Sequence, residues 1–432
     1  MADYTETVFR LMREGKVDQA NEAFEALKMD LEKYPDEDFW AQTAYHFQSA
    51  GFIPYAQSLY QEAQALFPNS ERWKLLNADA HMANGEFEEA LDQLLVIDEM
   101  SPYYLEALLM QADAYQGLYF PEMSEIKLKE ARDLAPDEPA IILGLAELNY
   151  SEGRFQEALP YYQSLLADPN ALDEAAMQVA TTHYREALGE SGQFEEALDL
   201  LAAIPEAERT QAEVEQMAIY YVETEDYEKA NTLLSPLYED GELSAYCLPI
   251  YAQVLTYYHE ETKAIRVLDE AIVKNPLQET LYQQRAKLYL ALKQDEEGAE
   301  DLEQLLTLDD ENITARLLLM RTRLQMNHPE EALVVLEDAP TDIQDPEFDW
   351  LAGKIYEENE DYKKARTYYE QAYPKLKQDD SFMLDYLTFE REEGQWHTLK
   401  LAFQERPALK DQAEFQWLYD DLLNQETWGE EE

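Results

Sequence analysis

The chain has 432 residues, with 92 acidic and 33 basic side chains and a formal net charge of −59. Such an acidic surface repels phosphate backbones and anionic lipid headgroups, so we expect neither nucleic acid nor a membrane surface as a partner. Hydrophobic residues make up 46% of the chain, which is enough for a sizeable core, and glycine is scarce at 13 residues. This composition favours helices joined by short loops over folds that need many tight turns.

The amino end shows no basic region followed by an apolar run, and no apolar stretch approaches the ~18 residues of a membrane span. Cys247 is the only cysteine, which leaves no intrachain disulfide and no cysteine-rich metal site. We therefore expect a cytoplasmic protein with no direct membrane insertion.

One helical signature recurs along the chain: a small residue is followed four positions later by an aromatic residue or leucine. Two residues four apart lie on the same face of a helix, one turn from each other. The small residues are spaced 33 to 39 positions apart, most often 34, and are Ala20, Ala56, Ala90, Ser124, Ala158, Ala197, Ala230, Ala264, Gly298, Ala332 and Ala365.

Each of these helices is preceded by a second helical pattern, which carries its own small residue twelve positions upstream in most units. A turn, often with glycine, separates the two patterns, and a proline is expected to end the second helix at Pro68, Pro102, Pro136, Pro169, Pro205, Pro276, Pro340 and Pro374. The unit is therefore predicted to be a helical hairpin with helices of about 12–14 residues. One hairpin cannot bury its apolar face alone, so successive hairpins must stack.

This pattern resembles the tetratricopeptide repeat family. The unit from Phe39 to Pro68 fits best, and its matching residues are Trp40, Ala44, Phe47, Gly51, Ala56, Tyr60, Ala63 and Pro68. About twelve units cover residues 3–405, and the stretch from Leu118 to Leu166 is similar to the YpiA-like tetratricopeptide proteins of Gram-positive bacteria. The resemblance implies an all-α, right-handed superhelix with a concave groove in which peptides lie.

We divide the chain into an array of five to six repeats over 1–190, a second array over 191–405 that continues the first, and a capping helix with an acidic tail over 406–432. The longest spacing, 39 residues between Ala158 and Ala197, has two readings. Either one helix is extended by a turn through 173–176, or the segment 168–190 is a joint between two sub-arrays. The capping helix is predicted over 411–424, with a frayed tail at 426–432.

Motifs that carry chemistry are missing from the sequence. We find no glycine-rich phosphate loop, no nucleophile elbow, no paired-histidine zinc motif and no calcium loop. The many paired carboxylates, such as Glu88 with Glu89, stand at helix starts, where negative charge is favourable. We therefore predict no catalytic residue, no cofactor and no metal site, and we do not expect an enzyme.

The candidate binding residues follow the small residue of each first helix by one position, which in the resembling family faces the groove. The series is Tyr45, Asp79, Asp113, Glu147, Glu186, Ile219, Gln253, Lys287, Arg321 and Lys354. Four acids are thus followed by two uncharged residues and three bases. Tyr150 and Tyr257 are added because they fall on the side of their helices opposite the recurring core positions, and aromatic residues with a polar tip are enriched at interfaces. An accidental series at a solvated position is the alternative.

The favoured function is a non-catalytic scaffold or adaptor that binds extended protein segments in the groove. A partner segment with a basic stretch at one end and an acidic stretch at the other would satisfy both halves of the series. Two alternatives stay open: a structural subunit or spacer of a larger assembly, and an enzyme or metal protein whose site is assembled from distant repeats.

Overall fold

The computed structural model describes residues 2–33, 36–341 and 343–429, and within these ranges the chain forms α-helices and two short 3-10 helices without any β-strand. The chain divides into two compact units, with the division between Arg209 and Thr210. No helix in these ranges combines the length and the apolar composition that crossing a lipid bilayer requires.

The described residues of the first unit form twelve α-helices. They are α1 (Ala2–Arg13), α2 (Val17–Glu32), α3 (Glu37–Ser49), α4 (Ile53–Leu66), α5 (Arg72–Ala83), α6 (Phe87–Leu94), α7 (Tyr104–Gly117), α8 (Pro121–Leu134), α9 (Pro139–Ser151), α10 (Phe155–Leu166), α11 (Glu174–Glu190) and α12 (Phe194–Ala202), followed by the 3-10 helix η1 (Glu206–Glu208).

The second unit contains thirteen α-helices in its described part. They are α13 (Gln211–Glu223), α14 (Tyr227–Glu239), α15 (Leu248–Tyr257), α16 (Glu261–Lys274), α17 (Glu279–Ala291), α18 (Asp295–Leu308), α19 (Ile313–Gln325), α20 (Pro329–Glu337), α21 (Pro346–Glu358), α22 (Tyr362–Leu376), α23 (Asp380–Glu392), α24 (Trp396–Glu405) and α25 (Ala413–Gly429), with the 3-10 helix η2 (Pro407–Asp411) before α25.

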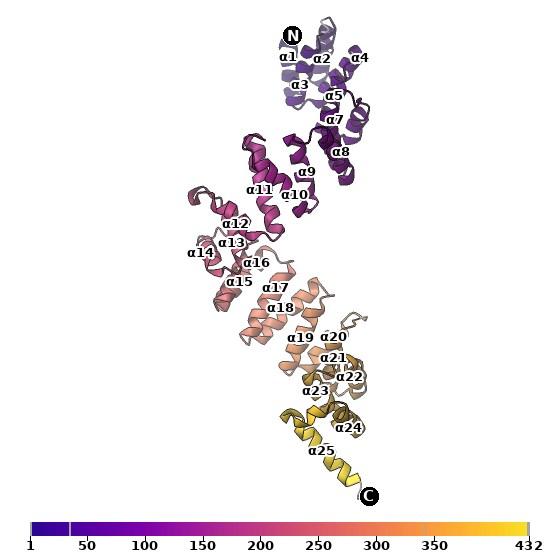
Figure 1. Ribbon diagram of the computed structural model, residues 1–432, viewed down its shortest axis with the longest axis vertical. Helices are drawn as coiled ribbons and strands as arrows, with labels where there is room; N and C mark the ends of the chain where they lie inside the picture. Colours follow the sequence, from indigo (N-terminus) through magenta and orange to yellow (C-terminus); the bar gives the residue numbers. More distant parts are fainter. Residues whose placement is uncertain (1, 34–35, 342, 430–432) are drawn as a thin grey trace. The chain divides into compact units, whose positions relative to one another are not determined.

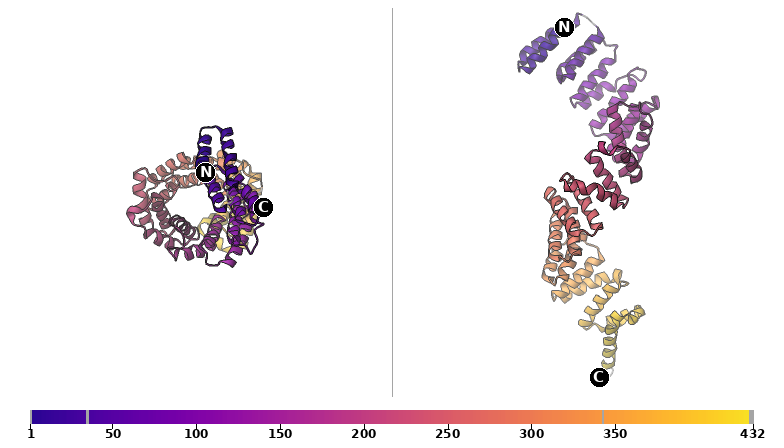
Figure 2. Two further views of the ribbon diagram at one scale, coloured as in Figure 1. Left: turned by 90° about the horizontal axis from the view of Figure 1, so that it is seen from above. Right: turned by 90° about the vertical axis from the view of Figure 1, so that its left-hand side faces the viewer.

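Inside each unit the helices form antiparallel pairs that stack in chain order (Figures 1 and 2). The first helix of a pair packs on the second, as α3 does on α4, and the second packs on the first helix of the next pair, as α4 does on α5. Consecutive first helices also touch, as α19 and α21 do. The predicted all-α repeat fold is confirmed: twelve helical pairs precede α25 in the described ranges. That both units form one right-handed superhelix stays a prediction.

The small residues of the signature lie where two helices cross. Ala44 in α3 and Ala56 in α4 are fully buried, and the bulky residue four positions after Ala56, Tyr60, is buried as well. The Tyr60 hydroxyl still finds a partner, because it donates to Gln48 Oε1 at 2.9 Å. Small side chains therefore allow close approach of the backbones, and the tyrosine fills the remaining space.

The turn inside each hairpin contains one residue with a positive φ. Glycine stands there in six turns, at Gly15, Gly51, Gly85, Gly153, Gly192 and Gly394, and another residue in six, at Tyr119, Glu225, His259, Lys293, Asn327 and Glu360. Five of these six non-glycine residues belong to the second unit. A left-handed conformation costs a non-glycine residue roughly 1–2 kcal/mol, so strain is concentrated in the turns of that unit.

Three local features bear on the sequence predictions. Helix α11 has 17 residues and begins after Asp173, whose side chain accepts from the Ala176 N–H, so the extension by a turn is confirmed. The prediction that Pro374 ends its helix is wrong: it lies inside α22, near the end, where losing one backbone hydrogen bond costs little. The capping helix is confirmed, with buried Phe415 and Leu418 packed into the core of the last repeats.

The bounds of the capping helix differ from the predicted 411–424. Asp411 belongs to η2, and the helix runs from Ala413 to Gly429. It therefore includes 426–429, for which a frayed tail was predicted, because no glycine or proline interrupts it before Gly429. The remaining residues of that predicted tail, 430–432, lie outside the described residues.

Candidate functional site

The ten predicted groove residues occupy the same place in ten consecutive first helices, from α3 to α21. We call these positions the inner line: Tyr45, Asp79, Asp113, Glu147, Glu186, Ile219, Gln253, Lys287, Arg321 and Lys354. All ten are exposed or half-buried, whereas the residue before each one is buried. The five positions up to Glu186 lie in the first unit and the five from Ile219 in the second.

Three contacts of the inner line with a neighbouring first helix share an offset of about one turn. Lys354 in α21 binds Asp385 in α23, with 2.7 Å between Nζ and Oδ2. In the first unit, Glu147 Oε2 lies 2.9 Å from Nδ1 of His183, which stands three residues before the next inner-line position. Gln48, three residues after Tyr45, donates to Asp79 at 2.6 Å. Polar side chains therefore join the line to the neighbouring first helix at these three places.

The acidic half of the line is largely satisfied by such contacts. Glu147 also accepts from the Tyr162 hydroxyl at 2.9 Å, and Glu186 accepts from the Tyr150 hydroxyl. Asp113 differs, since it has no hydrogen-bond or ion-pair partner among the described residues. Its side chain is open to solvent, but the protein around it partly desolvates the carboxyl and raises its pKa. A carboxylate that is accessible to solvent and still surrounded by protein atoms is what a concave surface would produce.

The basic half of the line lies in the second unit, and two of its three members are paired within the chain. Lys354 binds Asp385, and Arg321 forms an ion pair with Glu347 of α21. For Lys287 in α17, the place that Asp385 takes relative to Lys354 is held by Leu318. No carboxylate pairs with the exposed Lys287 ammonium in the part of the chain that the structure describes.

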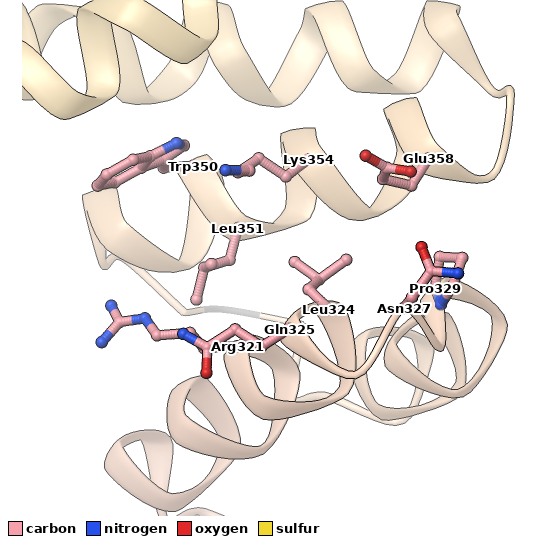
Figure 3. A pocket seen from close by; sticks show the side chains of 9 residues that line it. All are labelled: Arg321, Leu324, Gln325, Asn327, Pro329, Trp350, Leu351, Lys354 and Glu358. Atoms are coloured by element: carbon pink, nitrogen blue, oxygen red, sulfur yellow. The ribbon is translucent and has the colours of Figure 1, made fainter. Parts of the chain in front are cut away.

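Two pockets open between consecutive first helices of the second unit, at equivalent places in the repeat. The first, of about 380 Å³, lies between α19 and α21 and is lined by Arg321, Gln325, Trp350, Lys354 and Glu358, among others. Figure 3 shows Trp350, Lys354 and Glu358 along one helix, with Leu351 of the same helix pointing toward the residues of the preceding repeat. The second pocket, also of about 380 Å³, lies between α15 and α17 and contains Gln253, Tyr257 and Lys287. Inner-line residues therefore line both pockets.

The tyrosines singled out from the sequence have different environments. Tyr45 is 61% exposed, and Tyr257 is 58% exposed with its ring stacked on Tyr227, 4.2 Å between ring centroids. Tyr150 is half-buried, stacks on His183 at 4.3 Å and donates to Glu186. Tyr45 and Tyr257 thus have exposed rings, whereas Tyr150 holds two neighbouring helices together.

Glu357, three residues after Lys354, was missed by the sequence analysis. It accepts a hydrogen bond from the Tyr369 hydroxyl at 2.7 Å. Burial is the main cause that raises the pKa of this carboxyl to about 7, and the nearby carboxylates of Glu392 and Asp385 raise it further. Its position, one turn after an inner-line residue, is the signal that could have identified it, as it could have for Gln48.

No group of three or more histidine, cysteine, aspartate or glutamate side chains in the described ranges is arranged to hold a metal ion. The polar side chains of the inner line instead offer charges and hydrogen-bonding groups along consecutive helices. Such a surface suits recognition of another chain.

Four family models match parts of the chain, and two of the matched ranges overlap at residues 346–355. Two tetratricopeptide repeat models match residues 42–104 and 296–355. The YpiA-like tetratricopeptide repeat model matches residues 116–169, and the model of the YpiA-like C-terminal tetratricopeptide repeats matches residues 346–410. The chain belongs to the tetratricopeptide repeat family.

Among characterised sequences, this tetratricopeptide repeat chain is similar to the TPR repeat-containing protein YpiA of Bacillus subtilis (strain 168). The two are 27% identical over 354 residues, which cover 80% of this chain and 81% of that protein. The likeness therefore extends well beyond the matched repeats.

Solved tetratricopeptide structures show weaker likeness. A tetratricopeptide repeat protein from Parabacteroides merdae ATCC 43184 is 16% identical with a TM-score of 0.42, covering 59% of this chain and 99% of that one. The Cut9–Hcn1 hetero-tetramer structure of the APC/C matches with 13% identity and a TM-score of 0.32, covering 92% of this chain and 85% of that one.

Proposed function

We propose that this protein is a non-catalytic scaffold or adaptor of the cytoplasm, and that its inner line binds extended segments of partner proteins. The observation that carries the proposal is the pair of equivalent pockets between consecutive first helices, at α15–α17 and α19–α21. An extended segment has side chains at regular intervals, and a repeated pocket offers regular places for them.

The ion pairs within the chain reduce the contribution that Arg321 and Lys354 can make to binding a partner. Arg321 and Lys354 already have acidic partners in the same chain, so an acidic segment must compete with Glu347 and Asp385 for them. Lys287, Arg321 and Lys354 together therefore contribute less to the affinity for an acidic segment than three unpaired bases would. The exposed aromatic surface at Tyr257 and the pockets gain importance as the source of affinity.

The proposal can be tested with random peptides displayed in a library and selected on the immobilised full-length protein. The variant Gln284→Trp/Gln325→Trp fills the two pockets with indole rings, and Lys274→Trp/Glu300→Trp adds the same rings on exposed positions of second helices. We expect selected peptides to lose binding to the first variant and to keep it with the second. Failure to select any peptide, or equal binding to both variants, would contradict the proposal and favour a spacer that uses other surfaces.

A further inference from the structure

Lys287 is distinguished from the other bases of the inner line, since it forms no ion pair with any residue that the structure describes. Leu318 stands where Asp385 stands for Lys354, and its side chain packs on the hydrophobic core of α17–α19. Other exposed lysines, such as Lys274 and Lys293, also have no carboxylate partner among the described residues, but neither of them lines a pocket between first helices. Its three donors are free for a group from outside the chain.

The pocket beside Lys287 has an apolar floor and an aromatic wall. Leu268 and Leu288 are buried at its base, and the stacked rings of Tyr227 and Tyr257 line it. No acidic residue lines this pocket, whereas Glu358 lines the equivalent pocket between α19 and α21. The pocket beside Lys287 is therefore the more favourable of the two for a negatively charged ligand.

Two amide side chains in the same pocket also have unused hydrogen-bonding capacity. Neither Gln253 nor Gln284 has a hydrogen-bond partner among the residues that the structure describes. They stand on facing helices, α15 and α17, on the two sides of the pocket. Side-chain amides that line a groove can bind the peptide groups of an extended segment.

From this arrangement we infer that the pocket binds an acidic residue of an extended partner segment together with an adjacent apolar side chain. The carboxylate pairs with Lys287, and the apolar side chain enters the space between the floor and the ring of Tyr257. The acid belongs to the interior of a segment, because repeats continue on both sides of the pocket. This inference rests on the proposed function, and it replaces recognition by a row of bases with recognition by one base and one apolar site.

The test uses a displayed library of random peptides with fixed flanks, selected on the full-length protein. Enriched sequences are synthesised with blocked ends and measured by fluorescence anisotropy against wild type, Lys287→Gln, Tyr257→Ala and the matched control Lys274→Gln. Lys274 is exposed at the end of α16, away from the pocket. Circular dichroism melting checks that all four proteins are folded.

We expect the enriched peptides to contain an aspartate or glutamate next to an apolar residue. Lys287→Gln should weaken binding about tenfold, the size of a charge-assisted contact, and should remove most of its salt dependence. Tyr257→Ala should also weaken it, and Lys274→Gln should have no effect.

Groove-dependent peptides without an acid, or binding that is unchanged in Lys287→Gln, would overturn this inference and leave the proposed function in place. Binding that requires a free carboxyl terminus would overturn it too. If no selected peptide depends on the groove, both the inference and the proposed function fail.

Discussion

Asp385 Oδ2 lies 2.7 Å from Lys354 Nζ and also accepts a hydrogen bond from the indole of Trp350 at 2.9 Å, so one carboxylate in α23 binds two side chains of α21. The Lys354 and Asp385 side chains are 37% and 28% exposed, which places the pair between a surface and a buried ion pair. Its effect on stability should accordingly be small but measurable.

We expect a double-mutant cycle of Lys354→Gln and Asp385→Asn to give a coupling free energy of about 0.5–1 kcal/mol. The measurement is urea denaturation of the four proteins, followed by circular dichroism. Lys375→Gln, an exposed lysine in α22, is the matched control and should leave the midpoint unchanged. A coupling energy of zero would show that the pair does not stabilise the contact between α21 and α23.

Glu357 predicts a pH dependence with a definite sign. Its folded pKa of about 7 lies above the ordinary 4.5, so between these values the folded protein binds a proton that the unfolded chain releases. The contribution of this group to the free energy of unfolding therefore falls as pH rises from 4.5 to about 7, and is constant outside that window. Tyr369 faces the carboxyl as a donor, and Asp385, Glu392 and Glu358 face it as charges.

The comparison is between wild type and Glu357→Gln, because protonation of other acids affects both proteins equally. From about pH 5 to about pH 8, wild type should lose on the order of 1 kcal/mol relative to the variant. Parallel pH profiles of the two proteins would mean that this carboxyl keeps an ordinary pKa in the fold.

The strained turns of the second unit predict stabilising substitutions. Lys293 has a φ of 61° and no ion-pair partner among the described residues, so Lys293→Gly should raise the free energy of unfolding by about 0.5–1 kcal/mol. Asn327→Gly should gain less, since asparagine tolerates this conformation better.

Replacing a glycine of another turn by alanine is the control for these substitutions. Gly153→Ala places a methyl group where nothing lies within 4 Å, so its expected loss of about 1 kcal/mol comes from the backbone alone. Urea midpoints measure all three variants. If Lys293→Gly and Asn327→Gly raise the free energy of unfolding equally, the strain of the left-handed conformation does not depend on the residue type, which contradicts the prediction.

The net charge of −59 predicts a dependence on salt. Self-repulsion should lower stability in very dilute buffer, and the Debye length of ~8 Å at physiological ionic strength should screen much of it. We expect the melting temperature to rise between very low and moderate concentrations of sodium chloride. A flat or falling curve, recorded by circular dichroism, would show that the charges are too well spaced to matter.

The hairpins could be predicted because their signals are local. Ala56 and Tyr60 lie one turn apart on one helix, and this spacing is visible without knowing any other part of the chain. The partners of the inner line could not be predicted in the same way. Asp385 is 31 residues from Lys354 rather than a full repeat of 34, because consecutive first helices meet with an offset of one turn.

The same limit explains why the sequence alone does not distinguish the three bases Lys287, Arg321 and Lys354. Whether Lys287 is paired depends on Leu318, which lies in a different helix at a position that the repeat pattern does not mark as special. The pKa of Glu357 likewise depends on burial between helices, which a single sequence does not reveal. The series of inner-line residues and its role in binding stay predictions.

Helix α25 has a consequence for how copies of this protein meet. Stacked repeats expose an apolar end that the next repeat would cover, and identical chains with open ends can join head to tail into filaments. Here Phe415, Leu418 and Leu422 occupy that end and pack against the last hairpin. A second chain could therefore stack on this face of the last hairpin only by displacing α25, a segment of the protein itself.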